Sequence, residues 1–394
     1  MPSSAIVIRD RPVEFEIKID DTRLPSNWKR ATLMTQPPPL ISRQDEITPT
    51  WLNAVLARNG HPDALIEDFT AESIGTGQVG ENLRLTPSYA ASGEEGPASL
   101  VAKLPSPNEV SRNTAVAQGI YQREVYFYAQ IAQTVGIRTP RCWHADVSSG
   151  GDRFVLIFED MAPALQGDQI LGCSTDQAAL AMVEAARLHA PRWNDPALGD
   201  LAWLSRPSAE AAALLQVVYQ GVLPGFEARF AERLPGSVID LARRFGQRIG
   251  AWAADLSGPR AVSHGDFRLD NMLFGDEDGG ASLAVVDWQT CSHGHPASDV
   301  AYFLGAGLLP DARRQEEEKL LALYHEQLLG LGVSGYGLES LHADYRRFSF
   351  SGFVMAVVAS QIVEISERGD AMFAAMAERH AEQIADLGAE AALP

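Results

Sequence analysis

The chain has 394 residues, which is enough for two lobes or two domains with a substantial core. Hydrophobic residues make up 46% and charged residues 21% of it, as in an ordinary soluble protein. The formal net charge of −19 argues against nucleic acid and anionic membrane surfaces as partners, because both would repel the chain.

Cysteine usage and apolar runs indicate the compartment. The three cysteines show no metal-binding spacing, and their odd number argues against a disulfide framework. Residues 1–15 carry charges and lack the apolar core of a signal peptide. The longest apolar stretches, such as 353–359, are far shorter than the ~20 residues that span a bilayer. The sequence therefore predicts a soluble, cytoplasmic protein.

Residues 1–48 are expected to form an N-terminal extension, to which no function is assigned. Residues 13–19 alternate between apolar and polar side chains, as an edge strand would, and Pro37-Pro38-Pro39 favours an extended connection. Thr48 or Thr50 can then cap a helix that carries Trp51, Leu52, Val55 and Leu56.

From about residue 68 to 160 the pattern is β-rich, and it contains a GxGxxG sequence formed by Gly75, Gly77 and Gly80. In a dinucleotide-binding oxidoreductase a helix would follow directly. Instead, residues 81–86 alternate as in a strand and the alternation stops at Pro87. The pattern favours a glycine hairpin over phosphates, with the oxidoreductase as the alternative.

Lys103 and Glu124 are expected to form an ion pair. In an extended segment, Lys103 points away from the face of Leu100, Ala102 and Leu104. One long helix is expected over about 114–134, and Glu124 lies in the middle of its inward face. That face is formed by Ala117, Tyr121, Glu124, Tyr128 and Ile131. A carboxylate in an apolar stripe requires a cation, and Lys103 is the candidate.

Residues 154–158 read as a buried strand that leads to Glu159-Asp160-Met161, where a hinge between lobes would offer backbone groups to adenine. The region 174–258 is helical, and it opens with a capping box formed by Ser174 and Gln177. Short strands return over 261–290, and residues 296–390 are again helical.

The segment His264-Gly-Asp-Phe-Arg-Leu-Asp-Asn271 carries the chemistry, together with Asp287 sixteen residues further on. Residues 272–274 and 283–286 read as the strands of a hairpin, so Asp266 and Asp287 can reach one pocket. A phosphotransferase needs one carboxylate to take the proton of an attacking hydroxyl. It also needs an amide and a second carboxylate to hold Mg²⁺ on the phosphates.

These motifs resemble the aminoglycoside phosphotransferase and choline kinase-like superfamily, and most of all its ecdysteroid kinase-like branch and bacterial relatives. The resemblance covers about residues 68–390. It is carried by Arg-Glu-Val-Tyr-Phe-Tyr around Glu124, by Phe158-Glu-Asp-Met161, by 264–271, by Asp287-Trp-Gln and by His295-Pro-Ala-Ser-Asp-Val-Ala-Tyr302. It implies an α+β, two-lobed protein-kinase-like fold, with a β-rich N-lobe over 49–160 and a mainly helical C-lobe over 161–394.

The resemblance also implies residue roles, with Mg²⁺ as cofactor and ATP or GTP as co-substrate. Asp266 would be the catalytic base, and Asn271 and Asp287 the metal ligands. Nucleotide contacts would come from Lys103 positioned by Glu124, from the loop of Gly75, Gly77 and Gly80, and from the hinge at Glu159 and Met161. His264 and Asp299 would brace the catalytic loop.

The acceptor is expected to be a small molecule with a hydroxyl group, because Gly265 stands where protein kinases have arginine. An apolar alcohol, an aminoglycoside and a pseudokinase without turnover remain alternatives. An apolar pocket or plain helical core would each explain the aromatic and polar side chains near the loop: Gln169, His189, Trp193, Trp203, Trp288, His293 and His295. The oligomeric state stays open.

Overall fold

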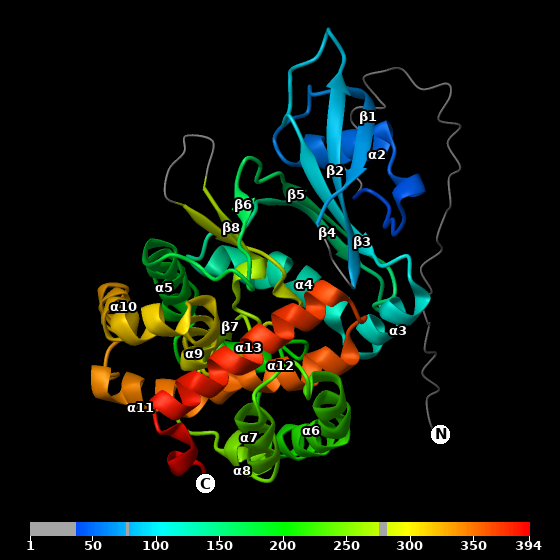
Figure 1. Ribbon diagram of the computed structural model, residues 1–394. Coiled ribbons are helices and arrows are strands. Elements are labelled where there is room, and N and C mark those ends of the chain that lie inside the picture. Colours follow the sequence, from blue (N-terminus) through cyan, green and yellow to red (C-terminus); the bar gives the residue numbers. More distant parts are fainter. Residues whose placement is uncertain (1–36, 76–78, 276–281) are drawn as a thin grey trace, which may run out of the picture.

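The computed structural model describes residues 37–75, 79–275 and 282–394. A β-rich part near the N-terminus stands above a larger helical part (Figure 1). The predicted α+β architecture is confirmed. The expected strand over 13–19 lies outside the described residues.

A five-stranded antiparallel sheet with the order β1-β2-β3-β5-β4 forms the upper part. Helix α2 (Pro49–Arg58) packs on one face, and the Thr48 hydroxyl caps it by accepting from the Trp51 amide. Inward residues alternate along the strands, as the sequence predicted for β3. The strands are β1 Ile66–Ser73, β2 Gly80–Tyr89, β3 Leu100–Pro105, β4 Cys142–Val147 and β5 Phe154–Glu159.

The single helix expected over 114–134 is wrong. The chain forms α3 (Glu109–Ala117) and α4 (Ile120–Tyr126), and then a π-helical turn and a short 3₁₀ turn. Gly119 separates the two helices with φ of 65°, a left-handed conformation that glycine adopts without strain. Ala117 is therefore exposed, whereas Glu124 and its other expected neighbours on the inward face are buried.

Short strands carry residues 264–287, which the sequence predicted to be catalytic and which are called the catalytic segment below. The predicted hairpin is confirmed, with Met272 opposite Val285 and Phe274 opposite Leu283. The strands are β6 Leu165–Gln166, β7 Ala261–Ser263, β8 Met272–Phe274, β9 Leu283–Val285 and β10 Ser292–Gly294. Strand β6 extends the hairpin at β8, and β7 pairs with β10.

Helices enclose these strands. The predicted capping box is present: the Ser174 hydroxyl accepts from the Gln177 amide, and the Gln177 side chain accepts from the Ser174 amide. The helices are α5 Thr175–His189, α6 Ala209–Phe230, α7 Gly236–Gly246, α8 Ile249–Ala254, α9 Pro296–Gly307, α10 Pro310–Gly330, α11 Leu338–Phe348, α12 Phe350–Ile362 and α13 Glu367–Asp386.

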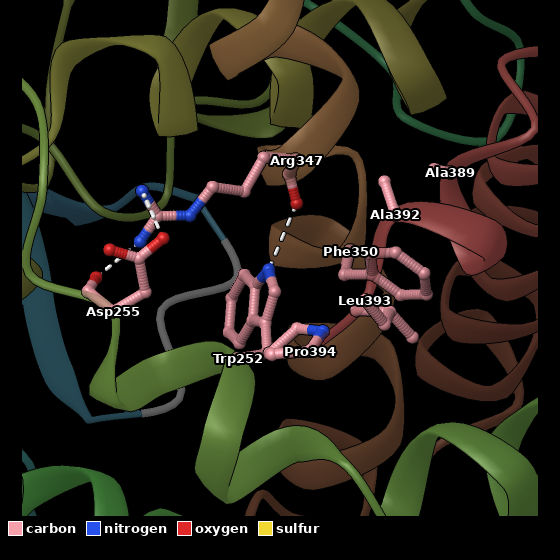
Figure 2. A pocket seen from close by; sticks show the side chains of 8 residues that line it. All are labelled: Trp252, Asp255, Arg347, Phe350, Ala389, Ala392, Leu393 and Pro394. Atoms are coloured by element: carbon pink, nitrogen blue, oxygen red, sulfur yellow. Dashed lines mark hydrogen bonds and ion pairs between the residues drawn. The ribbon is translucent and has the colours of Figure 1, made fainter.

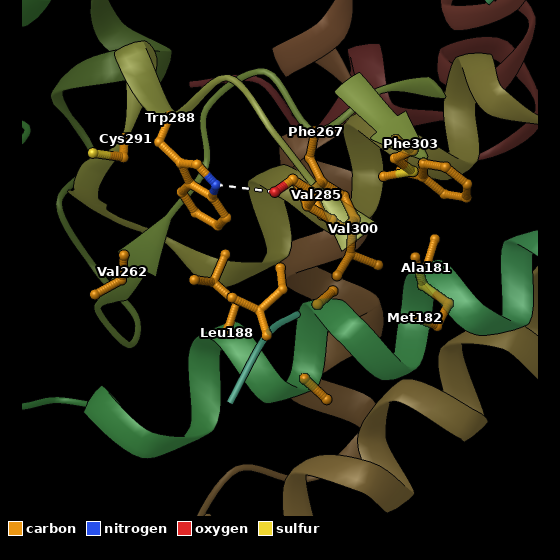
Figure 3. Close-up of a cluster of buried hydrophobic side chains, with 14 of the residues drawn as sticks. Ala181, Met182, Leu188, Val262, Phe267, Val285, Trp288, Cys291, Val300 and Phe303 are labelled. Carbon is orange, nitrogen blue, oxygen red and sulfur yellow. Dashed lines mark hydrogen bonds between the residues drawn. The ribbon is translucent and has the colours of Figure 1, made fainter. Parts of the chain in front are cut away.

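The core beneath the catalytic segment joins α5, α9 and the hairpin (Figure 3). Trp288 is fully buried there, and its indole NH donates to the Val285 carbonyl at 3.2 Å. Its ring stacks on Phe127 with centroids 3.8 Å apart, which fixes the segment after β9 against the turn that follows α4. Trp288 therefore belongs to the buried core and does not line an acceptor pocket.

The C-terminal residues close the far end of the helical part. Arg248 donates to the carbonyl oxygens of Leu393 and Pro394, and the Trp252 indole donates to the Arg347 carbonyl. Trp252, Arg347, Leu393 and Pro394 are among the residues that line a cavity of about 120 Å³ (Figure 2). In the part of the chain that the structure describes, no helix is long and apolar enough to cross a membrane.

His380 on α13 gives a stability prediction. The ring is fully buried, and glycines at 305 and 352 leave room for it. Burial lowers the pKa of His380 to about 4. Below the ordinary pKa of about 6.5, only the unfolded chain takes up this proton, so stability falls as the pH drops from about 6.5 to about 4.

The expected loss from His380 is roughly 3 kcal/mol over this range. Denaturant unfolding at several pH values between 7 and 4 gives the free energy of unfolding as a function of pH. The slope of this free energy against pH is then compared between wild type and His380→Gln. Substitution of the partly exposed His342 by Gln serves as the control. Equal slopes for wild type and His380→Gln would refute the prediction.

Candidate active site

Gly265 shapes the start of the loop that carries Asp266. Its φ is +81°, and a Cβ built there would lie 2.6 Å from the Thr290 carbonyl oxygen. Any side chain would therefore clash with the backbone of the segment after Asp287. The glycine that the sequence showed in place of arginine is required by this close approach.

Asp299 on α9 holds the same loop from below. Its fully buried carboxylate accepts from the amides of His264 at 2.7 Å and Gly265 at 2.9 Å. His189 Nε2 lies 3.2 Å away, and its Nδ1 lies 2.8 Å from the Tyr324 hydroxyl. Burial raises the pKa of Asp299, but the His189 contact and the Gly265 amide outweigh it, so the pKa lies below the ordinary value. His189 thus belongs to this brace and not to an acceptor pocket.

His264 connects the loop to the end of β9. Its Nε2 lies 3.0 Å from the Val286 carbonyl oxygen, which can only accept, so Nε2 carries the proton. Nδ1 is then the acceptor for the Asp266 amide at 3.2 Å. This pair of hydrogen bonds orients the backbone of Asp266.

The Asp266 carboxylate is surrounded by donors. Tyr302 donates its hydroxyl to Oδ1 at 2.7 Å, and Asn271 donates Nδ2 to Oδ2 at 2.9 Å. Arg268 Nε lies 3.0 Å from both oxygens. Burial raises the pKa of Asp266, but the charge of Arg268 and the Tyr302 hydrogen bond outweigh it, so the pKa is lowered. Asp266 is therefore an ionised carboxylate and a weak base.

Lys103 joins the sheet to the catalytic segment. The predicted ion pair with Glu124 is present, with Nζ 2.8 Å from Oε1. The sequence did not predict the second partner, Asp287, whose Oδ1 lies 2.9 Å from the same nitrogen. Burial opposes the charge on Lys103, but the two carboxylates outweigh it and raise the pKa. One cation facing two carboxylates leaves a net negative charge, which suits a further cation.

Asn271 and Asp287, the two residues expected to bind a divalent cation, come close together through the backbone of the catalytic hairpin. Asn271 directs its NH₂ to Asp266, which leaves its carbonyl oxygen for a metal. Its backbone carbonyl accepts from the Val286 amide, which places Asn271 beside the residue before Asp287. Asp287 adopts φ of 67°, an uncommon conformation for a residue with a side chain and one that is enriched at functional sites.

Among the residues that the structure describes, no group of three or more His, Cys, Asp or Glu side chains is placed to hold a metal. Mg²⁺ at nucleotide sites uses one or two protein carboxylates, and phosphates and water complete the shell. The donor set of Asn271 and Asp287 fits this arrangement and does not fit a site made of protein alone.

Gly80, from the expected glycine loop, and Glu159, from the expected hinge, lie opposite the two ends of β3. A Cβ at Gly80 would lie 3.1 Å from the Leu104 carbonyl oxygen and 3.4 Å from Lys103 Cε, so this glycine lets the start of β2 lie close to the lysine. Gly75 has φ of +74°, and Gly77 lies outside the described residues. Glu159 ends β5 and accepts from the Arg141 amide at 3.0 Å, and Met161 follows, half-buried.

The remaining candidates for the acceptor pocket are dispersed. Trp193 packs on Tyr336, and Trp203 packs on Tyr126. The others hold structure: His295 pairs with Asp344, His293 lies in β10, and the Gln169 side chain accepts from the Leu269 amide and donates to the Ala306 carbonyl. Trp193 and Trp203 both pack against the buried core that contains Trp288, so these tryptophans contribute to the packing of that core.

Sequence reasoning assigned no role to Arg268 and Tyr302. Both belong to the motifs that carry the family resemblance: Arg268 lies two residues after Asp266, and Tyr302 lies three residues after Asp299. The spacing of Asp299 and Tyr302 on one helical face was the available signal, since residues three apart on a helix lie side by side.

Comparison with known families decides the relationship of this chain to others. Residues 86–339, well over half of the sequence, match the phosphotransferase enzyme family. The chain belongs to this family. The match confirms the predicted superfamily and does not test the narrower resemblance to the ecdysteroid kinase-like branch.

Curated relatives of this phosphotransferase family member are similar over short stretches. Acyl-CoA dehydrogenase family member 10 of Mus musculus is 32% identical over 115 residues, which are 27% of this chain and 11% of that protein. Acyl-CoA dehydrogenase family member 11 of Homo sapiens is 50% identical over 61 residues, which are 14% of this chain and 8% of that protein. The similarity thus spans about a tenth of the length of these relatives.

Solved structures of other proteins show which fold this chain has. Choline kinase from Cryptosporidium parvum Iowa II superposes with a TM-score of 0.52 at 8% identity, covering 81% of this chain and 89% of that one. Ethanolamine kinase of Plasmodium vivax gives 0.48 at 12% identity, with coverages of 91% and 95%. The choline kinase match shows the same kinase-like fold.

Proposed function

We propose that the protein is a small-molecule kinase that transfers the γ-phosphate of ATP or GTP to a hydroxyl group. The contact between Lys103 and Asp287 carries this proposal, because it joins a sheet lysine to a catalytic-segment carboxylate 184 residues away. Residues 49–160 would form the nucleotide-binding lobe and residues 161–394 the catalytic lobe, with residues 1–48 as an extension. We place the protein in the cytoplasm.

Asp266 would orient the acceptor by accepting a hydrogen bond from its hydroxyl. The hydroxyl oxygen forms a bond to the γ-phosphorus while the bond from that phosphorus to the β,γ-bridging oxygen breaks, and nucleoside diphosphate leaves. The hydroxyl proton passes to Asp266. Because this carboxylate is strongly ionised, it accepts the proton late, as the attacking oxygen gives up electron density.

Other side chains would hold the nucleotide. Lys103 keeps Glu124 as its buried partner and offers an N–H group to the phosphates. The carbonyl oxygen of Asn271 and the carboxylate of Asp287 would hold Mg²⁺, which supplies positive charge for the phosphate oxygens when bound. Gly75, Gly77 and Gly80 would cover the phosphates, and Glu159 and Met161 would face the base.

Exposed apolar side chains near the loop favour an acceptor with an apolar part. Leu171 is 74% exposed and Ile365 is 72% exposed. Leu171 is three residues from Asp168 in the chain, and Ile365 is three residues from Arg368; Asp168 and Arg368 form an ion pair. Arg368 also contacts Asp270 in the catalytic loop at 3.2 Å. Because the curated relatives bear acyl-CoA dehydrogenase names, hydroxylated acyl thioesters join terpenoid alcohols among the candidates. An aminoglycoside is the alternative acceptor.

The test is Mg²⁺-dependent turnover of ATP and GTP against a panel of hydroxylated small molecules. The panel contains terpenoid alcohols, sterols, hydroxylated acyl thioesters, choline and aminoglycosides. We expect one acceptor class to be phosphorylated, with the activity lost in Asp266→Ala. Nucleotide binding without turnover on any acceptor would favour a pseudokinase, and no nucleotide binding would refute a kinase.

A further inference from the structure

We propose that Tyr302 is a positioning residue that fixes the rotamer of the Asp266 carboxylate, and that the acceptor hydroxyl takes the place of Arg268 on Asp266. The inference rests on the proposed function, since it concerns how the acceptor is aligned. It is based on the hydrogen-bond donors around the Asp266 carboxylate, because their side chains differ in how easily they can move away from it.

Three donor hydrogens surround the Asp266 carboxylate, and the single Nε–H of Arg268 bridges its two oxygens. A carboxylate offers about four lone-pair sites, two on each oxygen. Oδ1 accepts from Tyr302 and from Arg268, and Oδ2 accepts from Asn271 and from Arg268. The Nε–H of Arg268 holds the position between the two oxygens, so an acceptor hydroxyl donates there only when Arg268 withdraws.

Tyr302 is the donor least able to withdraw. It is 2% exposed in the core cluster of α9, and its ring lies 5.7 Å from that of His380. It sits one turn after Asp299, so one face of α9 holds both the loop backbone, through Asp299, and the Asp266 carboxylate. Burial and the nearby carboxylate raise the pKa of Tyr302, so the phenol keeps its proton as a donor.

Arg268 is the donor able to withdraw. Its side chain is 19% exposed, and its single Nε is shared between the two oxygens of Asp266. Nη1 already bonds Asp270 at 2.9 Å, so the guanidinium keeps an anionic partner when Nε leaves. Asn271 cannot leave without disturbing the proposed metal ligand. The acceptor hydroxyl therefore replaces Arg268, while Tyr302 holds the carboxylate in place.

Tyr302→Phe is the decisive variant, because it removes one hydroxyl and keeps the buried ring. The freed carboxylate can rotate, so we expect kcat to fall roughly 10- to 100-fold, the size of one lost hydrogen bond to a charged group. The KM for nucleotide should change less than about twofold, since Tyr302 does not contact that site.

The matched control is Tyr345→Phe. Tyr345 is equally buried, and its hydroxyl bonds Glu317 and Gln383 away from the catalytic loop. Its loss should leave kcat within about twofold of wild type. Thermal melts of both variants show whether a fall in kcat reflects unfolding.

A double-mutant cycle with Asp266→Asn separates positioning from general structure. If Tyr302 acts through Asp266, Tyr302→Phe costs kcat nothing further in the Asp266→Asn background. Acceptor-independent nucleotide hydrolysis supplies the readout where transfer is slow. The same cost in both backgrounds, or the same loss in Tyr345→Phe, would overturn the inference. A wild-type protein that turns over no nucleotide would instead overturn the proposed function.

Discussion

Asp266→Asn is expected to lower kcat roughly a thousandfold, within the range that a positioned general base contributes. The amide cannot accept the acceptor proton, and it meets the Arg268, Tyr302 and Asn271 donors with one acceptor oxygen in place of two. Nucleotide binding should persist, because the lysine and the proposed metal ligands remain. Steady-state turnover and nucleotide titration measure the two effects separately.

Asp270→Asn is the matched control for this loss. Asp270 lies in the same loop and bonds the same guanidinium through Arg268 Nη1, but it does not contact the proposed acceptor position. We expect its kcat to fall less than about tenfold. If both substitutions reduced kcat equally, the loss would come from the charge balance of the loop, and the base assignment would be wrong.

Asp287→Asn is expected to reduce turnover roughly 100- to 1000-fold, because the carboxylate of the proposed metal site is lost. The Mg²⁺ concentration at half-maximal rate should rise as well. Lys103 keeps Glu124 as its partner, so the fold around the lysine should survive. Rates measured over a Mg²⁺ series, with thermal shifts caused by Mg²⁺ and nucleotide together, check the prediction.

Gln289→Ala is the control for Asp287→Asn. The Gln289 amide donates to Asp287 Oδ2 at 3.0 Å, so its loss removes a support for the carboxylate and leaves the charge intact. A fall in turnover of less than about tenfold is expected. An Asp287→Asn protein with an unchanged Mg²⁺ dependence would show that the metal is held elsewhere.

Local signals in the sequence were sufficient for much of the fold. The capping box at Ser174, the hairpin on either side of the turn after Phe274 and the outward face of Lys103 depend on residues a few positions apart. The periodicity of apolar residues and the capping of helices depend on residues close together in the chain, so both can be recognised without a structure. The break at Gly119 had a local signal too, because a glycine inside a helical pattern weakens it.

The sequence by itself determined which candidate catalytic groups the chain carries: the Asp266 to Asn271 loop, Asp287 and the Lys103–Glu124 pair. Only the tertiary structure decided how these groups meet. Lys103 reaches Asp287 across 184 residues, and Tyr302 reaches Asp266 across 36. Such contacts follow from how α9, the hairpin and the sheet pack together, and packing is a property of the whole chain that no short pattern encodes.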